Sequence, residues 1–150
     1  MIRGMNREDR ELYMQMADEF YHSDAVLHPV PASFREAAWE EMMRSPDYVR
    51  GYLLELDGKP AGYGMLSFTF SQECGGKVAW LEELYVREEF RCRGLGKAFF
   101  AWMKEQIEPE VSRIRLELEP DNKRAAKLYQ SMGFEPLPYA QMVKEIPKEK

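Results

Sequence analysis

The chain has 150 residues, of which 45% are hydrophobic and 13% aromatic, which is enough to build one folded domain and argues against disorder. Its 21 basic and 26 acidic residues give a net charge of −5. That balance argues against binding to nucleic acid or to an anionic membrane, since both require a basic surface. We therefore expect residues 1–150 to form a single domain whose partner is a neutral or cationic small molecule.

Cysteine usage and the amino-terminal sequence bear on the compartment. Cys74 and Cys92 are far apart and lack the spacing of metal ligands, which favours a reducing compartment over a disulfide scaffold and predicts no metal site. The opening sequence MIRGMNREDR has no apolar signal-peptide core, and no run approaches the roughly 18 apolar residues of a membrane span. We expect a cytoplasmic protein.

The first half of the chain has the pattern of two helices and an antiparallel sheet. The expected elements are a strand at residues 2–5, helices at 7–21 and 33–44, and strands at 48–56, 60–70 and 78–86. Asn6 can cap the first helix, and Ser33 with Glu36 has the spacing of a capping box at the start of the second. Asp57-Gly58 is a hairpin-turn signal.

The second half changes to alternating helices and strands. The expected elements are helices at residues 94–107 and 122–132, and strands at 113–119 and 139–145. A strand, a helix and a strand in succession imply a crossover connection, so residues 79–86 and 113–119 should be parallel neighbours. The sequence therefore predicts an α+β fold with a mixed sheet and helices on both of its faces.

The segment RCRGLGKAF (residues 91–99) lies where the strand pattern changes to a helix pattern. Gly94 and Gly96 would let an anion approach the free amides of a helix amino terminus, and Arg91, Arg93 and Lys97 add positive charge there. A turn with solvated cations is the alternative interpretation. Neither the Rossmann nor the P-loop glycine spacing fits the segment.

Two longer stretches carry a family resemblance. LEELYV, RCRGLG and KAFFAWM in succession resemble motif A of the GNAT superfamily of acyl-CoA-dependent N-acetyltransferases, and LELEPDNKRAAKLYQSMGFEP resembles its motif B. The order of elements extends the resemblance over essentially the whole chain. It implies the GNAT fold: a twisted mixed sheet of six to seven strands with about four helices on both faces, and splayed parallel strands that hold acetyl-CoA.

The resemblance also implies which residues bind the coenzyme. The pyrophosphate would rest on the backbone of residues 92–97, with nearby cations neutralising the phosphates. Leu84 and Val86 would offer backbone groups to the pantetheine arm, and a main-chain N–H at Leu84 or Tyr85 would stabilise the oxyanion of acetyl transfer. The implied coenzyme-binding residues are Leu84, Tyr85, Val86, Arg91, Cys92, Arg93, Gly94, Leu95, Gly96, Lys97 and Asn122.

Three residues are catalytic candidates. By itself, Tyr129 would be read as a packed tyrosine, but the resemblance places its hydroxyl beside the coenzyme sulfur as a general acid. Glu82 and Glu83 interrupt an apolar central strand, and strand alternation predicts that they point to opposite faces. WLEELYV resembles the corresponding strand of the diamine acetyltransferases, which favours Glu82 as the base, acting through water, with Glu83 second.

The resemblance implies an acceptor pocket shaped by the first helices and the SQECGGK hairpin (residues 71–77), with the loop of residues 22–33 overhanging it. Asp18, Glu19 and Asp24 would favour a cation there, and His22 or His28 could be a second base. The candidate aromatic walls are Phe20, Tyr21, Trp39, Phe68 and Phe70. We expect acetyl transfer to a small cationic amine in a ternary complex. A protein lysine or amino terminus as acceptor, and a non-catalytic acyl-CoA sensor, remain as alternatives, and a homodimer is left open.

Overall fold

The computed structural model describes residues 1–148. They form two compact units, Met1–Glu117 and a second that begins at Leu118, and each unit is described by itself. The single domain expected from the length of the chain stays a prediction.

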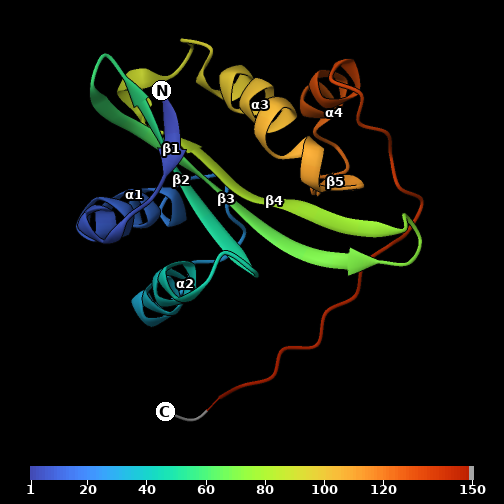
Figure 1. Ribbon diagram of the computed structural model, residues 1–150, viewed down its shortest axis with the longest axis horizontal. Coiled ribbons are helices and arrows are strands. Elements are labelled where there is room, and N and C mark those ends of the chain that lie inside the picture. The colour runs from blue at the N-terminus through green and yellow to red at the C-terminus, as the bar shows by residue number, and fades with distance from the viewer. Residues whose placement is uncertain (149–150) are drawn as a thin grey trace. The chain divides into compact units, whose positions relative to one another are not determined.

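The first unit is a five-stranded sheet with helices on both faces (Figure 1). Its elements are β1 (Ile2–Gly4), α1 (Arg10–Tyr21), α2 (Ala32–Arg44), β2 (Val49–Leu56), β3 (Lys59–Ser71), β4 (Gly76–Val86), α3 (Leu95–Gln106) and β5 (Arg113–Leu116). The strands lie in the order β1-β2-β3-β4-β5, antiparallel except for the parallel pair β4–β5. The α+β fold and the parallel pair predicted from the sequence are therefore confirmed.

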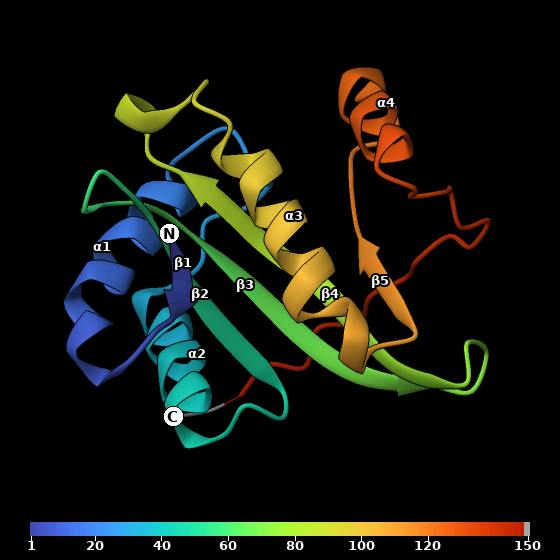
Figure 2. The same ribbon diagram turned by 45° about the horizontal axis from the view of Figure 1, so that its top comes forward.

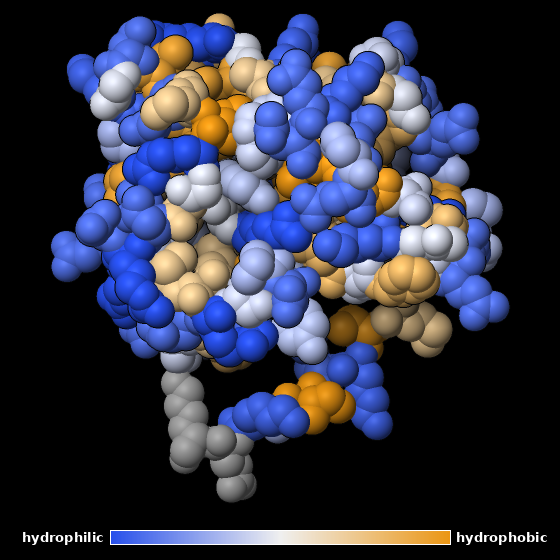
Figure 3. Space-filling view, in the orientation of Figure 1, coloured by the Kyte–Doolittle hydropathy of each residue, from blue (hydrophilic) through white to orange (hydrophobic). Residues whose placement is uncertain are grey.

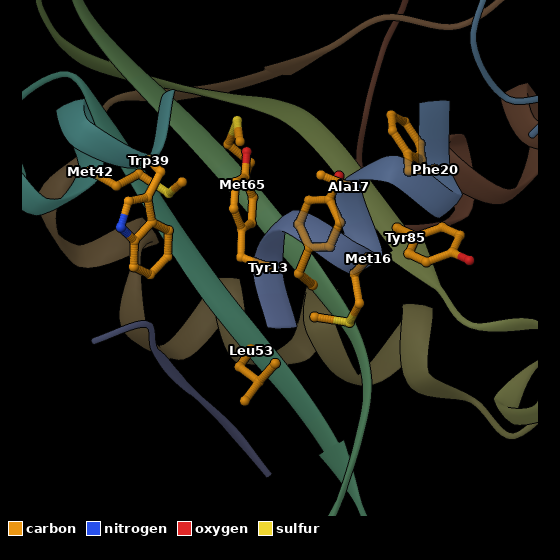
Figure 4. Close-up of a cluster of buried hydrophobic side chains, with 10 residues drawn as sticks. Tyr13, Met16, Ala17, Phe20, Trp39, Met42, Leu53, Met65 and Tyr85 are labelled. Carbon is orange, nitrogen blue, oxygen red and sulfur yellow. The ribbon is translucent and has the colours of Figure 1, made fainter. Parts of the chain in front are cut away.

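Two hydrophobic clusters lie on opposite faces of this sheet. Helices α1 and α2 pack on one face and α3 on the other (Figure 2). The α1–α2 cluster contains Tyr13, Met16, Ala17, Phe20, Trp39, Met42, Leu53, Tyr63, Met65 and Tyr85 (Figure 4). The α3 cluster contains Tyr52, Leu54, Ala61, Leu66, Phe68, Ala79, Leu95, Phe99, Met103 and Ile107.

Local signals account for most of the element boundaries. Asp57 and Gly58 take positive φ angles of 54° and 74°, as the two-residue hairpin turn between β2 and β3 requires. Asn6 caps the 3-10 turn that leads into α1. The predicted capping box at Ser33 is wrong, because α2 begins one residue earlier: the carbonyl of Pro31 accepts the first helical N–H, and Ser33 lies inside the first turn.

The second unit contains one helix among its described residues, α4 (Lys123–Ser131). The side-chain oxygen of Asn122 accepts the N–H of Ala125 at 3.1 Å and caps this helix. The strand predicted at residues 139–145 is wrong, since that segment has no regular secondary structure. A strand needs a hydrogen-bonded neighbour, and residues 118–148 contain no strand for it to pair with. The sheet therefore has five strands rather than six or seven.

The surface is predominantly hydrophilic on the face seen in Figure 3, where hydrophobic residues gather in small separate groups. Within residues 1–148, no helix combines the length and the apolar character that crossing a bilayer requires.

Candidate active site

A β-bulge in β4 sets the geometry of the two candidate carboxylates. Leu81 pairs with Leu66 of β3 and Glu83 pairs with Met65, so two consecutive β3 residues face β4 residues that are two apart. Glu82 is the extra residue. A bulge of this kind interrupts side-chain alternation along the strand that carries it.

Because of the bulge, both carboxylates lie on the α1–α2 face. Glu83 accepts a hydrogen bond from Tyr63, a member of the α1–α2 cluster. Glu82 accepts one from Ser67 Oγ at 3.0 Å, and Ser67 shares that face because its two neighbours in β3 belong to the α3 cluster. The prediction that the two side chains point to opposite faces is therefore wrong.

Glu83 is a largely buried carboxyl held by two tyrosine hydroxyls. The hydroxyl of Tyr63 donates to Oε1 at 2.6 Å, and the hydroxyl of Tyr21, the last residue of α1, donates to Oε2. Burial raises the pKa of Glu83 above its usual range; the two hydroxyls act in the opposite sense, and the neighbouring charge of Glu82 raises the pKa further. Glu83 is thus a carboxyl whose proton affinity is strengthened by its surroundings, whereas Glu82 is exposed.

The acidic residues of α1 that were expected to attract a cation are already paired with arginines. Glu19 accepts hydrogen bonds from the hydroxyl of Tyr85 at 2.9 Å and from the guanidinium of Arg87 at 3.2 and 3.3 Å. Burial and the hydrogen bond to Glu19 raise the pKa of Tyr85 to about 12. Asp18 lies 3.2 Å from the guanidinium of Arg35. Asp24, the third acidic residue expected at this site, lies in the loop after α1 and is exposed.

The loop between α1 and α2 is tied down through the same Asp18–Arg35 pair. Nη1 of Arg35 donates to the carbonyl of Val30 at 3.2 Å, and Nδ1 of His22 lies 2.7 Å from the carbonyl of Asp18. Both His22 and His28 are exposed. His22 therefore contacts Asp18 of α1 rather than Glu82 or Glu83 of β4. The role of His22 or His28 as a second base stays a prediction.

The expected aromatic walls are mostly core residues. Trp39 and Phe20 are buried in the α1–α2 cluster, and Phe70 is 77% exposed. Phe68 belongs to the α3 cluster on the opposite face, where its ring lies 4.0 Å from the guanidinium carbon of Arg50. Only Tyr21 of the five predicted walls contacts one of the carboxylates.

The predicted phosphate-binding loop has an open backbone. Gly94 takes a φ of 79° and precedes α3, and a Cβ at either Gly94 or Gly96 would meet nothing within 4 Å. Cys92 in the same loop also has a positive φ, 63°, which is uncommon for a residue other than glycine. The amino terminus of α3 therefore presents backbone amides that a phosphate could approach closely.

The cations of this loop are partly held by local contacts. Nε of Arg91 donates to the carbonyl of Val86 at 3.0 Å, which joins the loop to the end of β4. The guanidinium carbon of Arg93 lies 6.0 Å from the ring centre of Phe90. Lys97 is exposed on the first turn of α3.

β5 is shorter than β4 and ends before it. β5 pairs with β4 only from Val78 to Leu81, whereas β4 continues to Val86 (Figure 2). Within Met1–Glu117, the β5-side edge of β4 is therefore left without a strand partner from Glu82 onwards. This is the geometry expected where an extended ligand lies beside a strand.

Tyr129 and Asn122 both lie in the second unit. Tyr129 is half-buried on α4, its ring centre lies 6.0 Å from that of Phe134, and burial raises its pKa. A phenol with a raised pKa stays protonated at neutral pH, as a proton donor must. The acid role of Tyr129 and the coenzyme contact of Asn122 stay predictions.

Residues 1–148 contain no group of three or more histidine, cysteine, aspartate or glutamate side chains that could hold a metal ion. Cys74 and Cys92 are both free thiols.

Comparison with known proteins identifies the family. The model of the acetyltransferase (GNAT) family matches residues 11–134. The chain belongs to this family. Thialysine N-epsilon-acetyltransferase of Bos taurus is 32% identical over 95 residues, which cover 59% of this chain and 55% of that protein. The Mus musculus enzyme of the same name is 30% identical over 150 residues, 91% of this chain and 84% of that protein. The match to this chain spans about half the length of the bovine protein.

Solved structures support the same fold. The structure of AAC(6')-Iy in complex with the bisubstrate analogue CoA-S-monomethyl-acetylneamine matches with a TM-score of 0.75 and 21% identity, covering 98% of each chain. GNAT proteins use acetyl-CoA. That the loop at residues 91–97 and the unpaired edge of β4 bind this coenzyme stays a prediction. The family predicted from motifs A and B is therefore confirmed.

Three residues that shape this site were not predicted from the sequence. Tyr63, Arg35 and Arg87 each contact a carboxylate of the α1–α2 face. Strand alternation could have placed Tyr63 inward. Nothing in the sequence indicates which carboxylate it would meet.

Proposed function

We propose that this chain transfers the acetyl group of acetyl-CoA to the primary amine of a small cationic molecule, by direct attack in a ternary complex. The observation that carries the proposal is the Glu82–Glu83 pair, two carboxylates on one face of β4 beside the strand edge that fits the coenzyme. A nearby anionic pair attracts an ammonium group and can take its proton.

Each group then has a defined part in the reaction. Acetyl-CoA supplies the thioester that the amine attacks. An ammonium group with a pKa near that of lysine, about 10.4, must lose a proton before it can attack, and the β4 carboxylates are the base candidates. A main-chain N–H at Leu84 or Tyr85 would stabilise the developing oxyanion, and Tyr129 would protonate the leaving thiolate.

The acceptor class rests on chemistry as well as on relatives. The relatives are named for thialysine, and the solved neighbour holds a neamine-derived analogue, so each is named with an amine-bearing small molecule. In this chain Asp18 and Glu19 of α1 are paired with arginines, and β4 presents one exposed carboxylate, Glu82, next to the largely buried Glu83. We infer that the acceptor presents a single ammonium group to this pair rather than a highly charged surface.

The experiment is a thiol-release assay with acetyl-CoA and a panel of amines. The panel includes lysine, thialysine, spermidine, an aminoglycoside and a peptide with a free amino terminus, and we expect turnover with at least one small amine. Coenzyme binding without turnover on any amine would overturn the proposal in favour of an acyl-CoA sensor. Turnover on the peptide alone would overturn the small-molecule acceptor.

Tyr129→Phe tests the acid. It removes one hydroxyl and keeps the ring, so we expect acetyl-CoA affinity within about twofold and a kcat lowered by about 10²-fold, the usual scale of a general acid. Isothermal titration gives the affinity and thiol release gives kcat. An unchanged kcat would remove Tyr129 from the mechanism.

A further inference from the structure

Both oxygens of the Glu83 carboxyl are occupied by tyrosine hydroxyls, and the two hydroxyls differ in access. Tyr63 donates to Oε1 and is fully buried, with 0% of its surface exposed. Tyr21 donates to Oε2 from the carboxyl end of α1 and is only half-buried, next to the loop of residues 22–31. Tyr63 is closed off from solvent, so Tyr21 is the one of the two hydroxyls that a molecule outside the core can meet beside the partly exposed Glu83.

We propose that Tyr21 is a catalytic residue that relays a proton from the acceptor ammonium to Glu83, so that Glu83 is the base and Glu82 the group that binds the ammonium. This inference rests on the proposed function. Glu82 suits the binding part, because it is exposed, next in sequence to Glu83 and on the same face. Tyr21 suits the relay, because a hydroxyl that donates to Glu83 still has a lone pair to accept an N–H.

The relay balances protons without any further reactant. One N–H bond of the ammonium breaks as an O–H bond forms on Tyr21. The original O–H bond of Tyr21 breaks as an O–H bond forms on Oε2 of Glu83. The products are a neutral amine, an unchanged tyrosine and a neutral carboxylic acid, and Glu83 returns its proton to solvent after product leaves.

The groups around Tyr21, Tyr63 and Glu83 favour proton transfer from Tyr21 to Glu83. The titratable and charged groups that face these three residues are Tyr13 from α1, Arg35 from α2 and Glu82 from β4. Burial strengthens the proton affinity of Glu83 and raises its pKa, which suits a base that works near neutral pH. Burial and the hydrogen bond to Glu83 raise the pKa of Tyr21. Tyr21 therefore does not accumulate as a phenolate, and it gains one proton as it gives up the other.

Tyr21→Phe and Tyr63→Phe form a matched pair, since each removes one hydroxyl from the same carboxyl. We expect both variants to raise the pKa of Glu83, because each hydroxyl stabilises the carboxylate. The acidic limb of the kcat/KM profile should then move to higher pH in both. Only Tyr21→Phe should also lower the pH-independent plateau, by about 10²-fold or more, against less than about tenfold for Tyr63→Phe.

Two measurements separate the relay from a structural role. Carbonyl-¹³C NMR of glutamate-labelled protein without coenzyme gives the pKa of Glu83, with Glu83→Gln assigning the signal. The pH profile of thiol release gives the plateau. A Tyr21→Phe/Glu83→Gln double variant should be no slower than the slower single variant, because the two residues act as one unit.

Several results would overturn the proposal. Equal plateau losses in Tyr21→Phe and Tyr63→Phe would make Tyr21 a structural partner only, and an ordinary glutamate pKa at Glu83 would return the base to Glu82. If Tyr21→Phe does not fold, the test is Glu83→Gln: an undiminished kcat/KM plateau in that variant would also overturn the relay. If the wild-type protein turns over no amine, both the proposed function and the relay are overturned. If the wild type turns over an amine but Tyr21→Phe and Tyr63→Phe lose the same plateau activity, only the relay is overturned.

Discussion

The two faces of the sheet are packed with different chemistry. The α3 cluster contains one tyrosine, Tyr52, and otherwise aliphatic, phenylalanine and methionine side chains. The α1–α2 cluster contains three tyrosines, Tyr13, Tyr63 and Tyr85, and the last two donate to the carboxylates of Glu83 and Glu19. Buried polar groups stabilise a fold only when they are paired, so the α1–α2 face gives up apolar burial to hold carboxylates in place. The difference indicates that the α3 face is specialised for apolar packing, whereas the α1–α2 face also holds the carboxylates proposed for the chemistry.

Phe99→Ala should have the largest effect on stability. Phe99 is fully buried, and its ring lies so close to Gly64 that a Cβ there would be 2.4 Å from it. Truncation leaves a cavity, and we expect a loss of about 3–5 kcal/mol of unfolding free energy, measured by urea denaturation. Lys104→Ala, at an exposed position on the same helix, is the control and should change stability by less than about 0.5 kcal/mol. A small loss in Phe99→Ala would contradict the stabilising role of the α3 face.

Glu83→Gln should sharpen the contrast by changing stability and activity in opposite directions. Because the pKa of Glu83 is raised in the folded protein, the folded state holds this proton more tightly than the unfolded chain does. The wild type therefore loses stability as pH rises from the ordinary glutamate pKa through the raised value. The loss is about 1.4 kcal/mol for each unit of difference, and the variant lacks it.

Urea denaturation of wild type and Glu83→Gln at pH 4 and pH 8 measures this difference. We expect the stability of Glu83→Gln relative to the wild type to increase from pH 4 to pH 8. Its rate of acetyl transfer should be lower than that of the wild type. Glu82→Gln is the matched control, an exposed carboxylate on the same strand. A stability difference that does not change with pH would mean that burial leaves the carboxyl of Glu83 unperturbed.

Ser67→Ala should have the smallest effect. It removes the hydrogen bond to Glu82, but both groups are at the accessible end of the α1–α2 face, where water can replace the hydroxyl. We expect a change below about 0.5 kcal/mol in unfolding free energy. A loss above about 1.5 kcal/mol would show that this end of the face is as closed as the environment of Glu83.

The sequence predicted the elements that depend on local patterns. The Asp57-Gly58 turn and the cap at Asn6 are specified within a few residues, and the structure confirms them. The capping box at Ser33 was wrong because Pro31, two residues earlier, already ends the loop. The strand at residues 139–145 was wrong because strand formation depends on a partner, which alternation in one segment cannot supply.

The candidate site divides in the same way. Its residue types could be predicted from the sequence, because Glu82 and Glu83 interrupt an apolar strand and Gly94 and Gly96 lie at the start of a helix. The motifs around them determined the family, because a phosphate loop is a local backbone structure built from consecutive residues. Which face each carboxylate occupies was decided by the tertiary structure. The bulge at Glu82 arises from pairing with β3, so the contact of Glu83 with Tyr21 and Tyr63 exists only once three distant segments pack together.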